Sequence, residues 1–158
     1  MRNYDGSAVL EAIRLILATH SDSAALTALG GFIEAYGFEK IFLGHLVNPY
    51  SVPLKDILYL SNWPEELKAA REKQAAILHD PVAICAMRSK RPFTWAEARA
   101  HATRSGRRIV DLVHGFGLTH GMMFPMHALD SVSGGVSLGG PLKTDLSPIQ
   151  IRELEIVC

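Results

Sequence analysis

One face of an expected helix in residues 61–81 combines aromatic, apolar and charged side chains. Trp63, Leu67 and Arg71 are spaced by four residues, and residues at this spacing share a helix face. If that face is turned to the interior, the Arg71 guanidinium must be neutralised by Asp80 or by a ligand, or must reach water along its own stem. The pattern indicates either one wall of a small-molecule pocket or an arginine at the rim of a packed helix.

Asp80 and Trp95 also have simple structural explanations. An aspartate followed by proline is a favoured start of a helix, because the carboxylate accepts from free backbone amides and the proline has no amide to leave unpaired. Trp95 has the size of a core side chain, whose indole N–H needs an acceptor when it is buried. Neither residue defines a binding site by itself.

Catalytic and metal chemistry find little support in the sequence. The seven histidines are scattered without the short spacings of a metal site, so we expect no metal. Cys85, Ser133 and Ser137 could be named as nucleophiles, but there is no Gly-x-Ser-x-Gly turn, and local spacing places no histidine beside them. We therefore expect no catalytic residue and no cofactor, and we interpret Cys85 as a small side chain on a buried face.

The composition is that of one soluble domain. The chain has 158 residues, of which 48% are hydrophobic and 20% charged, and no stretch approaches the roughly 18 apolar residues of a membrane span. Sixteen basic and sixteen acidic residues cancel, so the basic excess typical of nucleic-acid-binding domains is missing. Two cysteines and an N-terminal segment unlike a secretory signal predict a cytoplasmic protein with reduced thiols.

Periodicity and capping signals predict the elements that position these residues. Strands are expected in residues 38–47 and 56–61, and then in 121–129 and 133–140 with a turn around Asp130 and Ser131. Helices are expected in residues 7–20, 26–36, 64–80 and 81–88, from the capping box at 94–97 to about 114, and from 147 onwards. Pro125 favours an edge position or a bulge. The order indicates an α+β fold in which helices pack on an antiparallel sheet.

The ordered motifs of the central region resemble a known family. Trp63-Pro64, Asp80-Pro81-Val82 and Phe93-Thr94-Trp95 match, in order and spacing, the autoinducer-binding domain of LuxR-type transcription regulators, which act in quorum sensing. The similarity continues through residues 116–126, with Gly121 at a characteristic glycine, and covers most of the chain. It implies an α/β/α sandwich, with a central antiparallel sheet of about five strands and helices on both faces.

The resemblance also implies roles for individual residues around a buried N-acyl homoserine lactone. Asp80 would accept from the amide N–H of the ligand, and Trp95 would wall the lactone end. Trp63 stands where the family usually has a tyrosine near the acyl carbonyl, and its indole has one hydrogen to donate. Ser137 falls where a small hydroxyl residue often supports the same region.

Two positions depart from the family pattern. Leu67 stands where the family usually has a tryptophan that donates to the lactone carbonyl, and Arg71 stands where it usually has a tyrosine. An unsatisfied ligand carbonyl in a dry pocket costs about 1–3 kcal/mol, so either Arg71 or water replaces the lost donor, or the ligand is not a lactone. A guanidinium at this place is equally suited to a carboxylate. Our candidate ligand-binding residues are Trp63, Leu67, Arg71, Asp80, Trp95 and Ser137.

The leading hypothesis is a sensor domain, residues 1–158, that binds a small-molecule autoinducer and is not an enzyme. Occupancy would be coupled to homodimerisation, and to DNA binding through a C-terminal helix-turn-helix domain that these residues lack. No membrane partner is expected. Two alternatives are a sensor of a non-lactone, acidic metabolite and a ligand-independent dimerisation module. Met122, Met123, Phe124 and Met126 either shape an acyl tunnel or fill the core.

Overall fold

A five-stranded antiparallel sheet in the order β2-β1-β5-β4-β3 forms the centre of the molecule. The computed structural model describes residues 6–45, 59–74, 76–127 and 133–158. The strands are β1 (Lys40–His45), β2 (Tyr59–Ser61), β3 (Phe93–Thr94), β4 (His120–His127) and β5 (Ser133–Gly140). The α+β class and the antiparallel sheet predicted from the sequence are confirmed.

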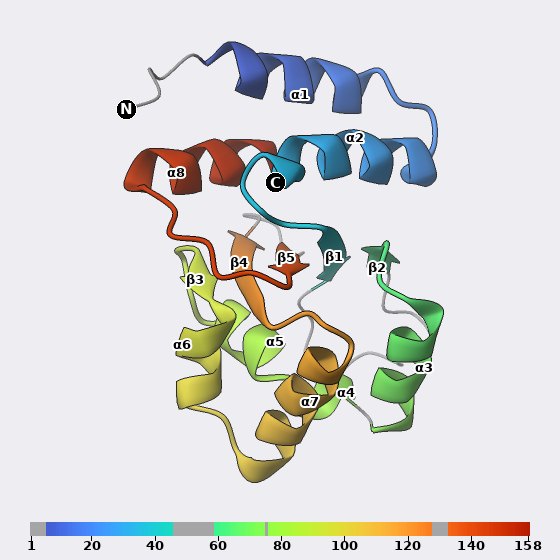
Figure 1. The fold of residues 1–158 in the computed structure, drawn as a ribbon, viewed down its shortest axis with the longest axis vertical. Coiled ribbons are helices and arrows are strands. Elements are labelled where there is room, and N and C mark those ends of the chain that lie inside the picture. The colour runs from blue at the N-terminus through green and yellow to red at the C-terminus, as the bar shows by residue number, and fades with distance from the viewer. Residues whose placement is uncertain (1–5, 46–58, 75, 128–132) are drawn as a thin grey trace.

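Helices cover both faces of this sheet (Figure 1). α2 and α8 lie on one face with α1 outside them, and α3 to α7 gather on the other. The helices are α1 (Ser7–Leu17), α2 (Asp22–Glu34), α3 (Glu65–Lys73), α4 (Ala76–His79), α5 (Pro81–Ala86), α6 (Trp95–Ala100), α7 (Arg104–Gly115) and α8 (Pro148–Val157). The layered arrangement implied by the family resemblance is confirmed.

The two faces of the sheet carry different side chains because successive residues of a strand point to opposite sides. On β5, Val136 and Leu138 are fully buried in the core beneath α2 and α8. Ser137, between them, belongs to the opposite face. The core on the α2 and α8 side consists of Leu29, Ile33, Phe38, Ile41, Met122, Phe124, Val136, Leu138 and Leu154.

Local signals in the sequence fix where α2 and α8 begin. Ser21 caps α2 by accepting from the amide of Ala24, and Ser147 opens α8 with the expected capping box. The turn that follows α2 is joined to α8 by a hydrogen bond of 2.8 Å from the hydroxyl of Tyr36 to the carboxylate of Glu153. The caps fix where α2 and α8 begin, and the hydrogen bond links the end of the α2 segment to α8 on this face of the sheet.

The prediction of one long helix from the capping box at Thr94 to about residue 114 is wrong. The capping box is present, but α6 ends at Ala100, and α7 begins at Arg104. Thr103 starts the new helix, because its side chain accepts from the amide of Gly106 at 3.1 Å. Gly106 also lies so close to α4 that an added Cβ would meet the carbonyl oxygen of His79 at 2.9 Å. The cap and this close approach separate the two helices.

Two further features differ from the sequence-based expectation. The helix expected in residues 64–80 is divided into α3 and α4, and the short strand β3 was not predicted. Pro125 lies on β4 opposite Gly135 of β5, outside the part of β4 that pairs with β3, so its missing amide removes no hydrogen bond to β3. The turn expected around Asp130 and Ser131 lies outside the described residues.

Within the described part of the chain, no helix has the length and apolar character that crossing a membrane requires.

Candidate functional site

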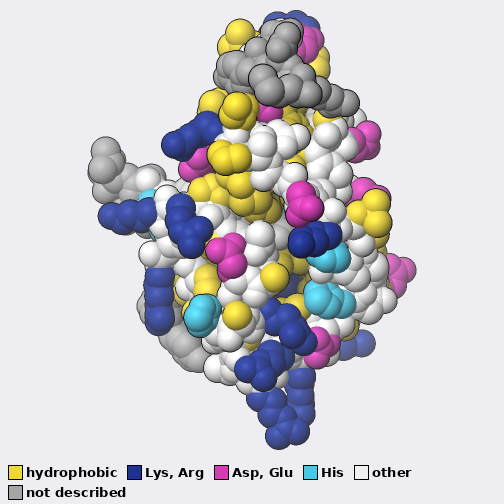
Figure 2. Space-filling view, turned by 60° about the vertical axis from the view of Figure 1, so that its left-hand side comes forward, with side chains coloured by type: hydrophobic (Ala, Val, Ile, Leu, Met, Phe, Trp, Pro, Cys, Tyr) yellow, Lys and Arg dark blue, Asp and Glu magenta, His cyan; other side chains and the backbone are white. Residues whose placement is uncertain are grey.

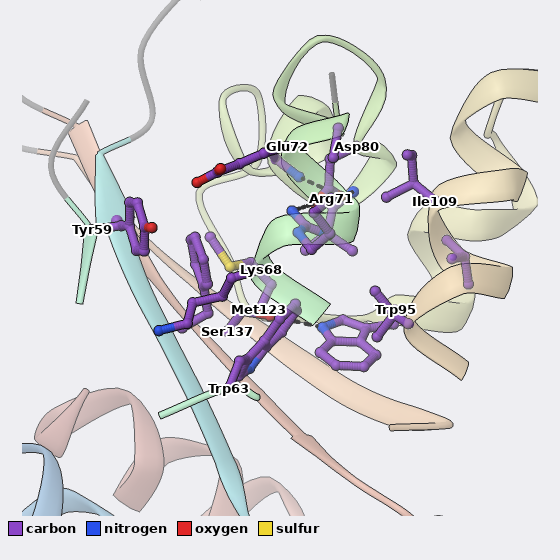
Figure 3. A pocket seen from close by; sticks show the side chains of 18 of the residues that line it. Tyr59, Trp63, Lys68, Arg71, Glu72, Asp80, Trp95, Ile109, Met123 and Ser137 are labelled. Atoms are coloured by element: carbon purple, nitrogen blue, oxygen red, sulfur yellow. Dashed lines mark hydrogen bonds and ion pairs between the residues drawn. The ribbon is translucent and has the colours of Figure 1, made fainter. Parts of the chain in front are cut away.

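A cavity of about 500 Å³ lies between the sheet and the helices α3, α4, α5 and α7 (Figure 3). Most of its surface is apolar, and its polar groups are few. Ser137 is among the labelled side chains beside the sheet, whereas Tyr59, Lys68 and Glu72 lie together along one side. Its lining comprises Phe42, Gly44, His45, Tyr59, Trp63, Lys68, Arg71, Glu72, Ala76, Asp80, Val82, Ala83, Trp95, Ile109, Val110, Val113, Met123, Gly135 and Ser137.

Small residues on this face of the sheet leave room for the cavity and for Trp95. Gly135 and Ser137 line it from β5, where larger alternating side chains would fill the space. Gly121 and Gly139 lie directly beneath the indole of Trp95, because a Cβ added at either would approach the ring to 2.2 Å or 2.5 Å respectively. The sheet therefore forms a floor on which the tryptophan ring rests.

Arg71 and Asp80 form an ion pair on the helical wall of the cavity. Nη2 of Arg71 donates to Oδ2 of Asp80 at 2.6 Å, and the two side chains are only 14% and 13% exposed. The guanidinium carbon also lies 5.2 Å from the ring centroid of Trp63 and 5.8 Å from that of Phe42. Of the ways to neutralise the arginine considered from the sequence, the structure contains the pairing with Asp80, reinforced by cation–π contacts.

The carboxylate of Asp80 serves two structural elements at once. Its Oδ1 accepts from the amides of Val82 at 2.8 Å and of Ala83 at 3.4 Å, so it caps the start of α5. Its Oδ2 is the oxygen that binds Arg71. The predicted capping role is confirmed, and the same side chain also presents a charged group to the cavity.

Trp95 and Ser137, which are far apart in the sequence, meet in the buried wall. The indole Nε1 of Trp95 donates to Oγ of Ser137 at 2.9 Å. Since the serine oxygen is used as an acceptor, its own hydrogen remains to be donated. The rings of Trp95 and Trp63 meet edge to face, with centroids 6.2 Å apart. The structure thus brings these three candidate residues together around one end of the cavity.

Trp63 and Leu67 differ from the other candidate residues because neither presents a hydrogen-bonding group to the cavity. Nε1 of Trp63 is buried and has no hydrogen-bond partner among the described residues, so its N–H is enclosed by protein and does not face open space. Leu67 is fully buried in an apolar cluster with Trp95, Val113 and Leu118, and does not line the cavity. Leu67 thus shapes the site through the packing of its neighbours.

Sequence reasoning missed most of the apolar lining. Phe42 and Tyr59 come from β1 and β2 and stack with centroids 5.3 Å apart, and α7 contributes Ile109, Val110 and Val113. The alternation in SGGVSLGG, with small residues at every second position, is a signal that could have located the sheet side. Of the methionine-rich strand, only Met123 lines the cavity, whereas Met122 and Phe124 face the opposite core.

Nucleophilic and metal chemistry have no evident support in the described residues. No group of three or more metal-binding side chains occurs there. Burial raises the pKa of the Cys85 thiol, and the nearby Arg88 opposes this effect only in part. A thiol with a raised pKa is protonated near neutral pH and is a poor nucleophile.

The fold, the cavity and the buried polar pair define a small-molecule-binding domain, and comparison with known proteins gives its family. The sequence profile of the autoinducer-binding domain matches residues 21–158. The chain therefore belongs to the autoinducer-binding domain family of LuxR-type transcription regulators, which act in quorum sensing. The family is a non-enzymatic one of ligand-binding domains, in agreement with the sequence-based expectation.

Individual relatives agree with this assignment. The transcriptional activator BjaR1 of Bradyrhizobium diazoefficiens is 29% identical over an alignment of 126 residues, and the match covers 78% of this chain. The matched region is 51% of BjaR1, so the chain spans about half the length of that relative.

Solved structures of the same fold include CepR2 of Burkholderia cenocepacia, described as an N-acylhomoserine lactone dependent transcription factor. It has a TM-score of 0.73 and 17% identity, and the match covers 96% of this chain and 87% of that one. SdiA in complex with octanoyl-rac-glycerol has a TM-score of 0.75 and 14% identity, with 99% of this chain and 65% of that chain covered. The match to SdiA from Escherichia coli in another structure has a TM-score of 0.74 and 13% identity, covering 96% of this chain and 63% of that one. These likenesses show a shared fold.

Proposed function

We propose that the cavity binds an N-acyl homoserine lactone as its signal molecule. The observation that carries this proposal is a buried donor–acceptor pair, Arg71 and Asp80, on the wall of a largely apolar cavity of about 500 Å³. An N-acyl homoserine lactone has the matching parts: an amide N–H for Asp80, carbonyl oxygens for the N–H groups of Arg71 and the hydroxyl of Ser137, and an acyl chain for the apolar lining.

The amide of such a ligand can share the carboxylate of Asp80 with Arg71. A carboxylate has about four lone-pair sites, and three hydrogen bonds to Asp80 are present. Arg71 supplies the donor that the family usually has at position 67, since leucine has no N–H in its side chain. The acyl chain would extend along Phe42, Val110 and Met123, which line the apolar part.

Thermal unfolding with a panel of N-acyl homoserine lactones tests the proposal. A ligand at about 100 times its Kd stabilises the folded state by about 2.7 kcal/mol. For a domain of this size, each kcal/mol raises Tm by about 2–4 °C, so a rise of about 5–11 °C is expected. No rise with any chain length between about four and fourteen carbons would contradict lactone binding.

A matched pair of variants shows whether the effect comes from the cavity. Ala83→Phe adds a ring to a residue that lines the cavity and should remove the rise in Tm. Ala96→Phe adds the same ring to an exposed position of α6 and should keep it. Loss of the response in both variants, or in neither, would contradict binding at this site.

We further propose that occupancy is coupled to homodimerisation and, in a longer regulator, to DNA binding by a helix-turn-helix domain. Support comes from the match to BjaR1, a transcriptional activator of which the chain covers 51%. Sedimentation of the chain with and without a stabilising ligand tests the first part: the expected result is a ligand-dependent shift from monomer to dimer. An unchanged sedimentation coefficient at saturating ligand would contradict it.

A further inference from the structure

Arg71 is fixed on three sides within the cavity wall. The rings of Trp63 and Phe42 lie within 5.2 Å and 5.8 Å of the guanidinium carbon, and Asp80 binds Nη2. Figure 3 shows the guanidinium beside Asp80, with Trp63 and Trp95 below it. An arginine held in this way presents its remaining N–H groups without first losing the freedom of a mobile side chain.

Most of the hydrogen-bonding capacity of Arg71 remains unused. A guanidinium has five N–H donors, and among the described residues Arg71 donates one hydrogen bond, to the carboxylate of Asp80. Its other nitrogens are not enclosed, because the only enclosed side-chain nitrogen or oxygen without a partner in the described part of the chain is Nε1 of Trp63. Arg71 lines the cavity, so N–H groups that Asp80 does not use can be reached by a ligand there, whereas the N–H of Trp63 is enclosed by protein.

Asp80 is not devoted to Arg71 alone. Asp80 accepts two backbone amides at the start of α5 as well as Arg71, so part of its negative charge is stabilised by the helix. Lys68, whose side chain is 17% exposed, adds a second cation to the lining and pairs with the outward Glu65. The acidic Glu72 also lines the cavity, and its carboxylate lies apart from Asp80 in Figure 3. The lining thus holds two cations and two carboxylates, and a ligand carboxylate would bind Arg71 through N–H groups that Asp80 does not use.

The adjacent donor and acceptor of this pair suit a ligand whose own donor and acceptor groups are close together. An acceptor and a donor 2.6 Å apart face the cavity together. In an N-acyl amino acid, the amide N–H and the carboxylate are attached to the same carbon, so the N–H can reach Asp80 while the carboxylate reaches Arg71. The planar fork of a guanidinium suits a carboxylate better than a single carbonyl oxygen.

We propose that the head group recognised by this cavity is a carboxylate, and that the ligand class is the N-acyl amino acids, including the ring-opened form of an N-acyl homoserine lactone. This inference rests on the proposed function in that it uses the same cavity. It differs in the group that Arg71 selects, because the ring-opened acid carries a negative charge and the closed lactone is neutral.

Equilibrium binding by calorimetry at pH 6.5 to 7 tests the inference with three ligands of the same acyl chain. They are the N-acyl homoserine lactone, the ring-opened N-acyl homoserine, and the primary amide of that ring-opened compound. The amide keeps the open chain and removes the charge. We expect the carboxylate to bind about tenfold more tightly than the amide, since charge-assisted hydrogen bonds are about twice as strong as neutral ones.

Variants then locate the preference at Arg71. Because Arg71→Met alone leaves Asp80 without its partner, the double variant Arg71→Met with Asp80→Asn removes both charges together. In this variant the carboxylate and the amide should bind equally within about twofold, and the circular dichroism spectrum should match the wild type. Arg107→Met, at an exposed position of α7 outside the cavity, is the control and should keep the tenfold preference.

The outcomes separate this inference from the proposed function. Binding of the lactone without a preference for carboxylate over amide would overturn the role of Arg71 and leave the lactone proposal intact. Binding of the carboxylate but not of the lactone would support the inference and overturn the lactone proposal. Binding of none of the three, at any chain length tested, would overturn both. A preference that persists in the double variant would overturn the assignment to Arg71.

Discussion

The contact between Trp95 and the sheet predicts the effect of one added methyl group. In Gly139→Ala, the new Cβ would lie 2.5 Å from Cη2, 3.1 Å from Cζ2 and 3.4 Å from Cζ3 of Trp95. Ordinary contacts of this kind lie at 3.4–4 Å, so the indole must move by about 0.9 Å, the difference between 3.4 and 2.5. The displaced ring is the one that donates to Ser137 at 2.9 Å.

Two opposing effects determine how much Gly139→Ala changes the free energy of unfolding. Overpacking a filled site costs about 1–3 kcal/mol. Replacing a glycine within a strand by alanine returns about 0.5–1 kcal/mol, because glycine loses more conformational freedom on folding. The midpoints of these ranges, about 2 and about 0.75 kcal/mol, give an expected net loss of about 1 kcal/mol in the free energy of unfolding. Weaker binding of any ligand that contacts Trp95 should accompany it.

Urea unfolding measured by tryptophan fluorescence and by circular dichroism gives the free energy of unfolding. Gly31→Ala is the matched control, since an added Cβ in this exposed part of α2 meets nothing within 4 Å. The control should gain about 0.5–1 kcal/mol. If Gly139→Ala is as stable as the wild type, or gains stability like the control, the indole does not rest on the glycine floor and the reasoning is refuted.

Three other perturbations have expected outcomes. Arg71→Met should lower the free energy of unfolding, measured by chemical denaturation, by about 3 kcal/mol, because it leaves the buried charge of Asp80 unpaired. Adding Asp80→Asn should recover part of that loss. An equal or larger loss in the double variant would count against the ion pair. Thr103→Ala should cost about 1 kcal/mol and Thr27→Ala should not, in the same assay, since only Thr103 caps a helix. Burial, with the hydrogen bond to Glu153, raises the pKa of Tyr36 above its usual value of 10.0. The protonated phenol therefore stabilises the fold below pH 10, and this stabilisation is lost as the pH rises further. A phenol titration in which all four tyrosines ionise together near pH 10 would contradict this.

Much of the fold was predictable because its signals are local. Alternation in β4 and β5, the capping boxes at Thr94 and Ser147, and the Asp80-Pro81 helix start all depend on neighbours within a few residues. The break between α6 and α7 was missed because Thr103 competes as a cap inside a segment that is otherwise periodic. Strand β3 was missed because two residues carry no periodicity of their own.

The site was only partly predictable because its geometry is not local. The sequence offered Asp80 as one of several partners for Arg71, and the fold selects it by ending α3 and starting α5 beside one another. The bond between Trp95 and Ser137 joins residues 42 apart in sequence, which no spacing rule foretells. The position of Leu67 behind the cavity wall follows from the packing of Trp63 and Trp95.

The clustering of surface charge could likewise be predicted only in part from the sequence. Figure 2 shows lysine and arginine side chains gathered at the lower end of the molecule, where Figure 1 places the connection between α6 and α7. Arg104, Arg107 and Arg108 are exposed there, as the solvated face expected from their polar neighbours. Sequence alone could not place them at one end, because the break at Thr103 sets the direction of α7.

The most direct test of a ligand-filled cavity is a two-dimensional NMR titration of the labelled chain with the acyl ligand that raises Tm most. The two tryptophans give two indole N–H signals. Of the methionines that the structure describes, Met123 lines the cavity, and its methyl group is expected to respond. We expect the Trp95 indole and the Met123 methyl signals to shift saturably at one ligand per chain, with nuclear Overhauser contacts from the acyl chain to Met123. Shifts confined to exposed side chains such as Leu10 and Leu142, with Trp95 and Met123 unchanged at saturation, would contradict the account.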